Sequence, residues 1–341
     1  MTDALTTVEP PAAATPRGGG GGTLRYVLSK VGAALISLGL IVVLGFVLFR
    51  VLLPGDPVRT LTRGAPVTPE GAAALEREYG FDLPLWGQFT RYLGNLAHGD
   101  LDRSLVFKVP VAQKIGERLG PTLLLVGVGT LIAVVLGLWL GTRTAWRRGS
   151  RFDRTATGIA LALWSAPTFW LGLVLLTATG GLFPSGGITY PDTPPDFLSQ
   201  ALDTAHHMVL PTITLVAVVY AQYQLVMRSS LVEEMHAEHL LTARAKGLRD
   251  DEVRRRHAVP NALLPTVTLV FLHLGLVVSG AITVETVFSW PGLGLLTFEA
   301  LRFPDYPLLQ GTFLVLAAAV VVMNLVADLL LRVLDPRVRA S

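Results

Sequence analysis

The sequence predicts an all-α membrane protein with six transmembrane helices. Of its 341 residues, 51% are hydrophobic and only 16% are charged, and the mean hydropathy is +0.53. Soluble domains carry about 25% charged residues, so this composition points to a membrane. Six stretches contain no Asp, Glu, Lys or Arg, and each is long enough to cross a hydrocarbon core of about 30 Å. They are 31–49, 119–142, 155–191, 208–227, 257–284 and 306–327.

Helices rather than barrel strands are expected, because the apolar runs show no alternation of polar and apolar residues. In lipid, each segment must also satisfy its own backbone hydrogen bonds, which a helix does. The predicted spans, in chain order, are 26–50, 119–142, 155–180, 207–227, 262–286 and 310–333.

These spans divide the chain into five segments. Residues 1–24 are rich in Ala, Pro, Thr and Gly and cannot bury a core, so they are predicted to be a disordered cytoplasmic tail. Residues 25–53 hold the first transmembrane helix, and 54–118, of mixed polarity, are predicted to form a small extracellular subdomain. A five-helix core at 119–334 follows, and 335–341 form a cytoplasmic C-terminal tail.

Local signals refine the segments between the spans. In the extracellular subdomain, Thr68 followed by Pro69 is a helix-start signal, and Gly80 closes that helix. The outer connection at 180–206 is rich in Gly and Pro and predicts irregular structure, whereas 288–307 predicts a re-entrant or interfacial turn.

The distribution of basic residues predicts the orientation. The connections on one side of the predicted membrane and the C-terminal tail carry 15 of the 28 basic residues, whereas the short opposite connections, 181–206 and 287–309, carry only Arg302. The segment 54–118 carries eight more, but long loops translocate largely regardless of their charge. Because cytoplasmic loops are enriched in Lys and Arg, both termini are predicted to be cytoplasmic. The net charge of +3 therefore reflects topology rather than a nucleic-acid surface. The basic residues on the cytoplasmic side are Arg143, Arg147, Arg148, Arg151, Arg154, Arg228, Arg244, Lys246, Arg249, Arg254, Arg255, Arg256, Arg332, Arg337 and Arg339.

The cytoplasmic loop at 228–260 is predicted to contain two helices around a break. Glu233 lies early in the first helix and Arg244 in its last turn, which suits the helix dipole. Gly247 can take the left-handed position that ends this helix, and Asp250 is a good N-cap for the second. A short helix is thus displayed on the cytoplasmic face.

At this loop the chain resembles the permease subunits of ABC importers for dipeptides, oligopeptides and nickel, the type I importers with an EAA loop. The resemblance rests on TARAKGL at 242–248 and RHAVPNALLP at 256–265. Further landmarks follow the family order across roughly residues 25–339: LPGDP, GDLDRSL, SAPTFWLG, VETVFSWPGLG, DYPLLQG and LDPRVR. Leu241 and Thr242 replace the usual Glu-Ala of the loop, and this departure is similar to what the peptide subgroup shows. Asp102 stands where the family usually has Gly.

The resemblance implies a type I importer permease fold in the bacterial plasma membrane. It implies a complex with a homologous second permease, two ABC ATPase subunits and an extracellular solute-binding protein. The short helix would couple this chain to the ATPase through Leu240, Leu241, Ala243, Arg244, Ala245, Lys246, Gly247 and Leu248. Transport of dipeptides or oligopeptides is the expected function, with nickel or another small solute as the alternative.

No enzymatic activity is expected in this chain. A phosphate-binding loop needs Gly-Lys before Ser or Thr, and none of the four lysines follows a glycine. ATP and Mg²⁺ are therefore expected on the partner subunits, with no cofactor in this chain. The absence of cysteine excludes disulfides and thiolate metal sites.

The histidine pairs raise the nickel alternative, but neither is predicted to bind a metal. His206 and His207 are adjacent at an outer membrane edge, and His236 and His239 are three residues apart on one predicted helical face. Metal sites usually need more converging ligands with supporting contacts, so interfacial or solvent-facing roles are preferred.

Polar residues inside apolar spans are costly and can mark a transport pathway. Hydrogen bonding between helices is the competing explanation for each. Glu285, at the outer mouth, could meet a peptide's amino terminus or brace the outer loop. An ion-coupled secondary carrier and a membrane-bound enzyme remain as other classes, but the first would need mid-membrane carboxylates and the second a clustered acid and histidine set. The pathway candidates are Tyr220, Gln222, Gln224, His273, Glu285 and Asn324.

Overall fold

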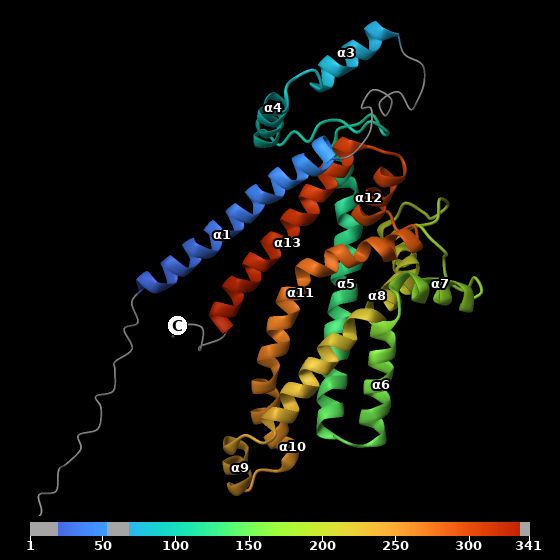
Figure 1. The fold of residues 1–341 in the computed structure, drawn as a ribbon. Helices are drawn as coiled ribbons and strands as arrows, with labels where there is room; N and C mark the ends of the chain where they lie inside the picture. Colours follow the sequence, from blue (N-terminus) through green and yellow to red (C-terminus); the bar gives the residue numbers. More distant parts are fainter. Residues whose placement is uncertain (1–19, 53–67, 335–341) are drawn as a thin grey trace, which may run out of the picture.

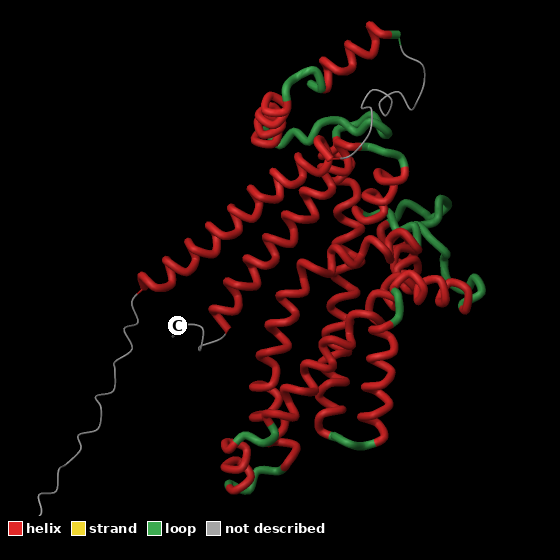
Figure 2. Tube along the Cα trace, in the orientation of Figure 1, coloured by secondary structure: helices red, strands yellow, loops and turns green. Residues whose placement is uncertain are grey.

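The structure, a computed structural model, describes residues 20–52 and 68–334, and in that part of the chain it consists of helices joined by loops, without strands (Figures 1 and 2). The all-α fold class is therefore confirmed. The elements are α1 (Gly20–Phe46), η1 (Val47–Leu52), α3 (Pro69–Tyr79), α4 (Leu85–Ala97), α5 (Val111–Trp146), α6 (Arg151–Ser165), α7 (Thr168–Ala178), α8 (Phe197–Glu234), α9 (Glu238–Ala245), α10 (Asp250–Val253), η2 (Arg254–Ala258), α11 (Val259–Val287), α12 (Leu293–Arg302) and α13 (Tyr306–Leu334).

The described residues contain four helices that are long and apolar enough to cross a membrane, at Leu24–Leu52, Val111–Trp146, Phe197–Glu234 and Tyr306–Leu330. The bent pair α6 and α7 gives a fifth if it is counted as one span. The helix α11 covers the predicted span 262–286, but the side chains of 272–280 lie outside those described. The count of six spans therefore stays a prediction.

The predicted third span, 155–180, is not one straight helix. It breaks between α6 and α7, whose axes differ by 106°. The cause is Pro167, because a proline disfavours the helical conformation of the residue before it. Ala166 accordingly takes an extended conformation, with φ −75° and ψ 134°.

The core of the fold is the packing of α5 against α8, where small residues of α5 allow the backbones to approach closely. A Cβ atom added at Gly137 would lie 2.6 Å from Cβ of Tyr223 and 2.8 Å from the carbonyl oxygen of Tyr220. One added at Gly141 would lie 2.7 Å from the carbonyl oxygen of Gln224. Such close approach of small residues is the usual way in which helices associate in a membrane.

A buried ion pair fixes α6 to the far end of α8. The Asp153 carboxylate, 3% exposed as a residue, accepts hydrogen bonds from Nε and Nη2 of Arg228 at 2.7 and 2.8 Å. It also accepts from the backbone N–H of Gly149 at 2.9 Å, and the Ser150 hydroxyl caps the same helix. The turn between α5 and α6 is thereby held against α8.

The outer subdomain follows the predicted start and stop signals. Thr68 caps α3 by accepting from the N–H of Gly71, and Gly80 ends α3 with φ +68°. Asp102, at the position where glycine is usual, takes φ +62° and accepts a hydrogen bond from Asn95. Burial is the main cause that raises the pKa of the Asp102 carboxyl.

The domain boundaries shift where the structure describes them. Helix α1 begins at Gly20, so 20–24 are helical rather than part of the predicted tail 1–24. Helix α5 begins at Val111, so the end of the predicted extracellular segment 54–118 belongs to the long helix. The rest of the tail, 53–67 and the C-terminal 335–341 lie outside the described residues.

Candidate coupling site

The segment between α8 and α11 forms a compact unit at the end of the molecule opposite α3 and α4 (Figure 1). Helix α8 runs to Glu234, a turn follows at 235–237, and α9 then crosses the end of the bundle before α10 and η2 lead into α11. The turn between α5 and α6 lies at the same end of the molecule. Helix α9 is the short displayed helix, but Glu233, predicted to lie early in the same helix as Arg244, belongs to the end of α8.

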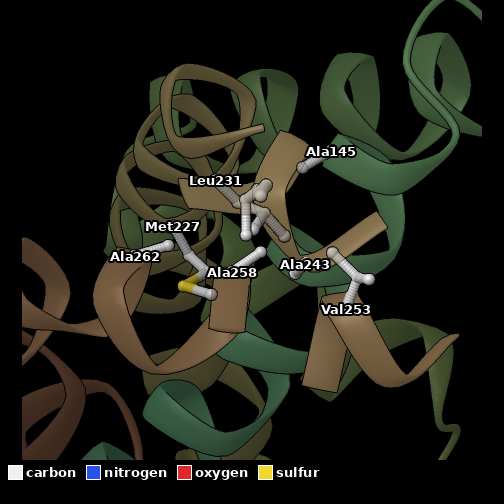
Figure 3. Packing of buried hydrophobic residues seen from close by; sticks show 8 residues of the cluster. Ala145, Met227, Leu231, Ala243, Val253, Ala258 and Ala262 are labelled. Carbon is white, nitrogen blue, oxygen red and sulfur yellow. The ribbon is translucent and has the colours of Figure 1, made fainter. Parts of the chain in front are cut away.

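One face of α9 is part of the hydrophobic core. Leu240 is completely buried and Ala243 is 6% exposed. Figure 3 shows Ala243 beside Val253 and Ala258 in the cluster that joins α9 to the surrounding helices. The other members of that cluster are Ala145, Met227, Leu231, Leu240 and Ala262. The buried face of α9 thus shares one cluster with residues of α5, α8 and α11.

The other face of α9 is open. Leu241 is 62% exposed, and Arg244, Ala245 and Lys246 are exposed as well. Leu241 and Ala245 are four residues apart and share one side of the helix. Arg244 forms an ion pair with Asp250 at 3.3 Å. The predicted coupling residues thus divide into a buried anchor and an exposed apolar and basic surface.

The end of α9 confirms the predicted role of Gly247. Its φ is +83°, in the left-handed region that favours glycine. Its N–H donates to the carbonyl of Arg244 at 2.9 Å, and the N–H of Leu248 donates to that of Ala243 at 3.4 Å. Leu248 then packs against the buried cluster.

Two further local predictions in this loop are wrong. Asp250 is the first residue of α10 rather than its N-cap, which is Arg249, and its carboxylate pairs with Arg244 instead. His236 and His239 do not share a helical face, because His236 lies in the turn between α8 and α9. In the part of the chain that the structure describes, no group of three or more His, Cys, Asp or Glu could hold a metal ion.

A polar contact that the sequence reasoning missed holds α9 beside the start of α11. The side-chain amide of Asn261 donates to Glu234 at 3.0 Å and lies 3.3 Å from Nε2 of His239. His239 in turn pairs with Glu234 at 3.1 Å. The only sequence signal was Asn261 within the Pro-Asn of the family motif, which does not reveal a partner on another helix.

The outer histidines have structural contacts. His207 is buried, and its Nδ1 lies 2.9 Å from the carbonyl oxygen of Asp203. Its ring meets the ring of Tyr190 edge to face at 4.6 Å, whereas His206 packs against Phe183. These contacts agree with the interfacial role that the sequence favoured.

The pathway candidates lie on three helices, α8, α11 and α13. Tyr220 and Gln224 are buried on α8, and the side-chain amide of Gln224 has no hydrogen-bond partner among the described residues. Gln222 is half-buried on the same helix, and Asn324 is exposed on α13. His273 lies in α11, but its side chain is outside those described.

Glu285 is completely buried, and its contacts support the bracing role. Its carboxylate accepts hydrogen bonds from the Thr122 hydroxyl at 2.7 Å and from the N–H groups of Gly294 and Leu295 at 2.7 and 3.1 Å. These N–H groups start α12 and have no partner within that helix. A Cβ atom at Gly292 would overlap the same carboxylate. The arrangement places a negative charge at the N-terminus of α12, where the helix dipole favours it.

Replacement of Glu285 by Gln should therefore destabilise the protein in the absence of any peptide. The amide NH₂ cannot accept from the donors that face the carboxylate, and the loss of a hydrogen bond to a charged group costs about 1.5–3 kcal/mol. The unfolding temperature of the purified protein measures the effect. The control is Glu117→Gln, whose exposed ion pair with Lys114 contributes little to stability. A Glu285→Gln variant of parental stability that takes up peptide poorly would instead support the substrate role.

Two comparisons with protein families cover most of the chain. The family model described as the inner membrane component of binding-protein-dependent transport systems matches residues 133–340, and the model for the N-terminal part of such components matches 23–110. The chain belongs to this family. It is thus a permease component of an ABC importer with several apolar helices in the membrane, as the sequence predicts.

Curated relatives of this permease match over nearly their full length. The chain is 36% identical over 336 residues to the dipeptide transport system permease protein DppB of Escherichia coli, covering 93% of this chain and 99% of that protein. It is 34% identical over 333 residues to the di/tripeptide transport system permease protein DppB of Pseudomonas aeruginosa, with coverage of 93% and 99%. It is 34% identical over 302 residues to the oligopeptide transport system permease protein AppB of Bacillus subtilis, with coverage of 87% and 94%.

A solved structure supports the fold of the permease. The MetNI methionine ABC transporter in an inward-facing conformation aligns with a TM-score of 0.51 at 19% identity, covering 65% of this chain and 96% of that chain. At this identity the likeness concerns the fold alone.

Proposed function

We propose that this permease forms the translocation pathway of an importer for dipeptides or oligopeptides. The observation that carries the proposal is the near full-length similarity to permeases that are named for dipeptide, di/tripeptide and oligopeptide transport. Substrate would arrive on an extracellular solute-binding protein, and a homologous second permease would complete the pathway. Two ATPase subunits would bind ATP and Mg²⁺ and supply the drive.

The exposed face of α9 is the proposed contact with the ATPase. Leu241 and Ala245 offer an apolar surface beside the basic side chains of Arg244 and Lys246. Movement of an ATPase subunit against this face would push Leu240 and Ala243 against the ends of α5, α8 and α11. Because packed helices shift as rigid units rather than deform continuously, this displacement would alternate the access of the pathway.

Uptake of a labelled dipeptide into proteoliposomes that contain the complete transporter and its binding protein tests the proposal. We expect uptake to require ATP and to compete with unlabelled dipeptide but not with nickel. Competition by nickel alone would favour the metal alternative. If uptake needed no ATP and a proton ionophore abolished it, the result would favour a secondary carrier. The structure does not support that class, because Asp328 is paired with Lys30 and Glu285 is buried.

The proposed orientation places α9 and both termini in the cytoplasm. Single cysteines at Ser185 and Ser289, both exposed at the outer end, should react with an impermeant thiol reagent applied to intact cells. A cysteine at Arg148, exposed in the turn between α5 and α6, should react only after the cells are opened. The chain has no native cysteine to interfere. The reverse labelling pattern would contradict the orientation.

A further inference from the structure

An open cavity of about 640 Å³ lies between α5 and the η2 and α11 segment, close to the coupling loop. Its inner wall is apolar and includes Val135 and Leu138 of α5 and Leu263 of α11. Trp139 and Trp146 line it from α5 at two different depths. Val135 to Thr142 belong to the charge-free run 119–142, so this wall lies within the part of α5 predicted to be in the membrane.

The rim of the cavity is strongly basic. Arg143 and Arg147 contribute from α5, and Arg254 and Arg255 contribute from η2. No Asp or Glu is among its lining residues in the described chain. Four guanidinium groups from two elements therefore face one opening.

The four arginines of the rim are only partly neutralised by carboxylates. Arg254 and Arg255 share one exposed carboxylate, that of Asp251. Arg143 and Arg147 form no ion pair within the described residues and instead lie over aromatic rings. The guanidinium carbon of Arg143 is 4.6 Å from the ring centroid of Trp139. The guanidinium N–H groups of Arg143 and Arg147 are therefore available to an anion, and the rim keeps an excess of positive charge.

The depth of the rim matches the boundary of the membrane. Arg143 follows directly after the charge-free run that ends at 142, and the nearby tryptophans are residues that favour the membrane interface. The cavity thus combines an apolar wall at the depth of acyl chains with a basic rim at the depth of headgroups. A free phosphate ion would use only the rim, whereas a phospholipid would use both parts.

We propose that this cavity binds an anionic phospholipid of the cytoplasmic leaflet, with its phosphate among the four arginines and its acyl chain along the apolar wall. Basic pockets between transmembrane helices on the cytoplasmic side are suited to such headgroups. The lipid would connect α5 to η2, and η2 is continuous with α10, whose Val253 packs in the buried cluster with Ala243. The bound lipid thereby stabilises the base on which α9 rests.

The test uses tryptophan quenching in the complete transporter, purified in detergent. Brominated phosphatidylglycerol should quench the fluorescence at lower concentrations than brominated phosphatidylcholine, and Trp146→Phe should reduce this difference. Each basic side chain near an anionic surface contributes about 1 kcal/mol, so Arg143→Gln/Arg147→Gln should weaken the apparent affinity for phosphatidylglycerol about thirtyfold. The matched control is Arg148→Gln/Arg151→Gln, which removes the same charge from exposed positions outside the cavity and should keep the parental affinity.

Several results would overturn the proposal. Equal quenching by the two lipids would show that charge does not matter, and equal loss in both double variants would show a general surface attraction. Displacement of the lipid by millimolar inorganic phosphate would indicate a site for a free anion. Absence of selective quenching in the assembled transporter would indicate that a partner subunit covers the cavity. Because binding rather than uptake is measured, failure here leaves the proposed transport function standing.

Discussion

Replacement of Gly247 by Val should abolish ATP-driven uptake while the chain still inserts into the membrane. Gly247 has φ +83°, and no heavy atom lies within 4 Å of a Cβ added there, so only backbone strain opposes a side chain. This strain costs about 1–2 kcal/mol for most residues and more for a β-branched one. The strained chain should relieve it by changing the end of α9, which would move Leu248 from the buried cluster. Uptake and substrate-stimulated ATPase activity of the reconstituted transporter measure the loss.

A matched pair of variants separates backbone conformation from contact with the ATPase. Gly247→Asn should keep most of the activity, because Asn tolerates the left-handed region better than other side chains. Leu241→Asp alters only the exposed face of α9 and should prevent stimulation of the ATPase without lowering the thermal stability of the permease. Parental uptake by both Gly247→Val and Leu241→Asp would mean that this loop is a connector without a role in coupling.

Local signals in the sequence were sufficient where a single residue determines the conformation. The start of α3 after Thr68, its end at Gly80 and the positive φ of Gly247 were predicted because such signals act within a few residues. Pro167 carried the signal for the bend between α6 and α7 in the same way, although the length of the apolar run concealed it.

The break between α8 and α9 could not be predicted locally, because no Gly or Pro interrupts 228–246. Its cause lies in tertiary packing. Leu231 and Leu240 are nine residues apart, about two and a half helical turns, so an unbroken helix would direct them to opposite sides. The turn at 235–237 lets both enter the same buried cluster. Burial of an apolar side chain contributes about 1.5–3 kcal/mol, enough to favour the break over a few continued helical hydrogen bonds.

The contacts of Glu285 also depend on tertiary packing and could not be predicted from the local sequence. The sequence placed a carboxylate near the mouth but did not show which groups face it. Thr122 is far away in the chain, and the N–H groups of Gly294 and Leu295 become donors only because α12 starts there. Gly292 and Gly294 in the WPGLG motif were the available signal, since side chains at either position would collide with Glu285.

Replacement of Gly137 by Leu should prevent the chain from folding. The added Cβ would lie 2.6 Å from Cβ of Tyr223 and 2.8 Å from the carbonyl oxygen of Tyr220, both on α8. Extra methylene groups in a packed core already cost about 1–3 kcal/mol. Here one of the obstructing atoms belongs to the backbone and cannot rotate away, so α5 and α8 must separate. The tyrosines and Gln224 would then lose the interface that buries them.

The measurement is the recovery of monodisperse permease after detergent extraction, followed by its unfolding temperature. Gly127→Leu on the same helix is the matched control, because it makes the same change in helix propensity and nothing lies within 4 Å of its added Cβ. We expect the control to be recovered at parental yield and the Gly137 variant to aggregate. Recovery of both variants with the same unfolding temperature would show that α5 and α8 are not packed as closely as this structure places them.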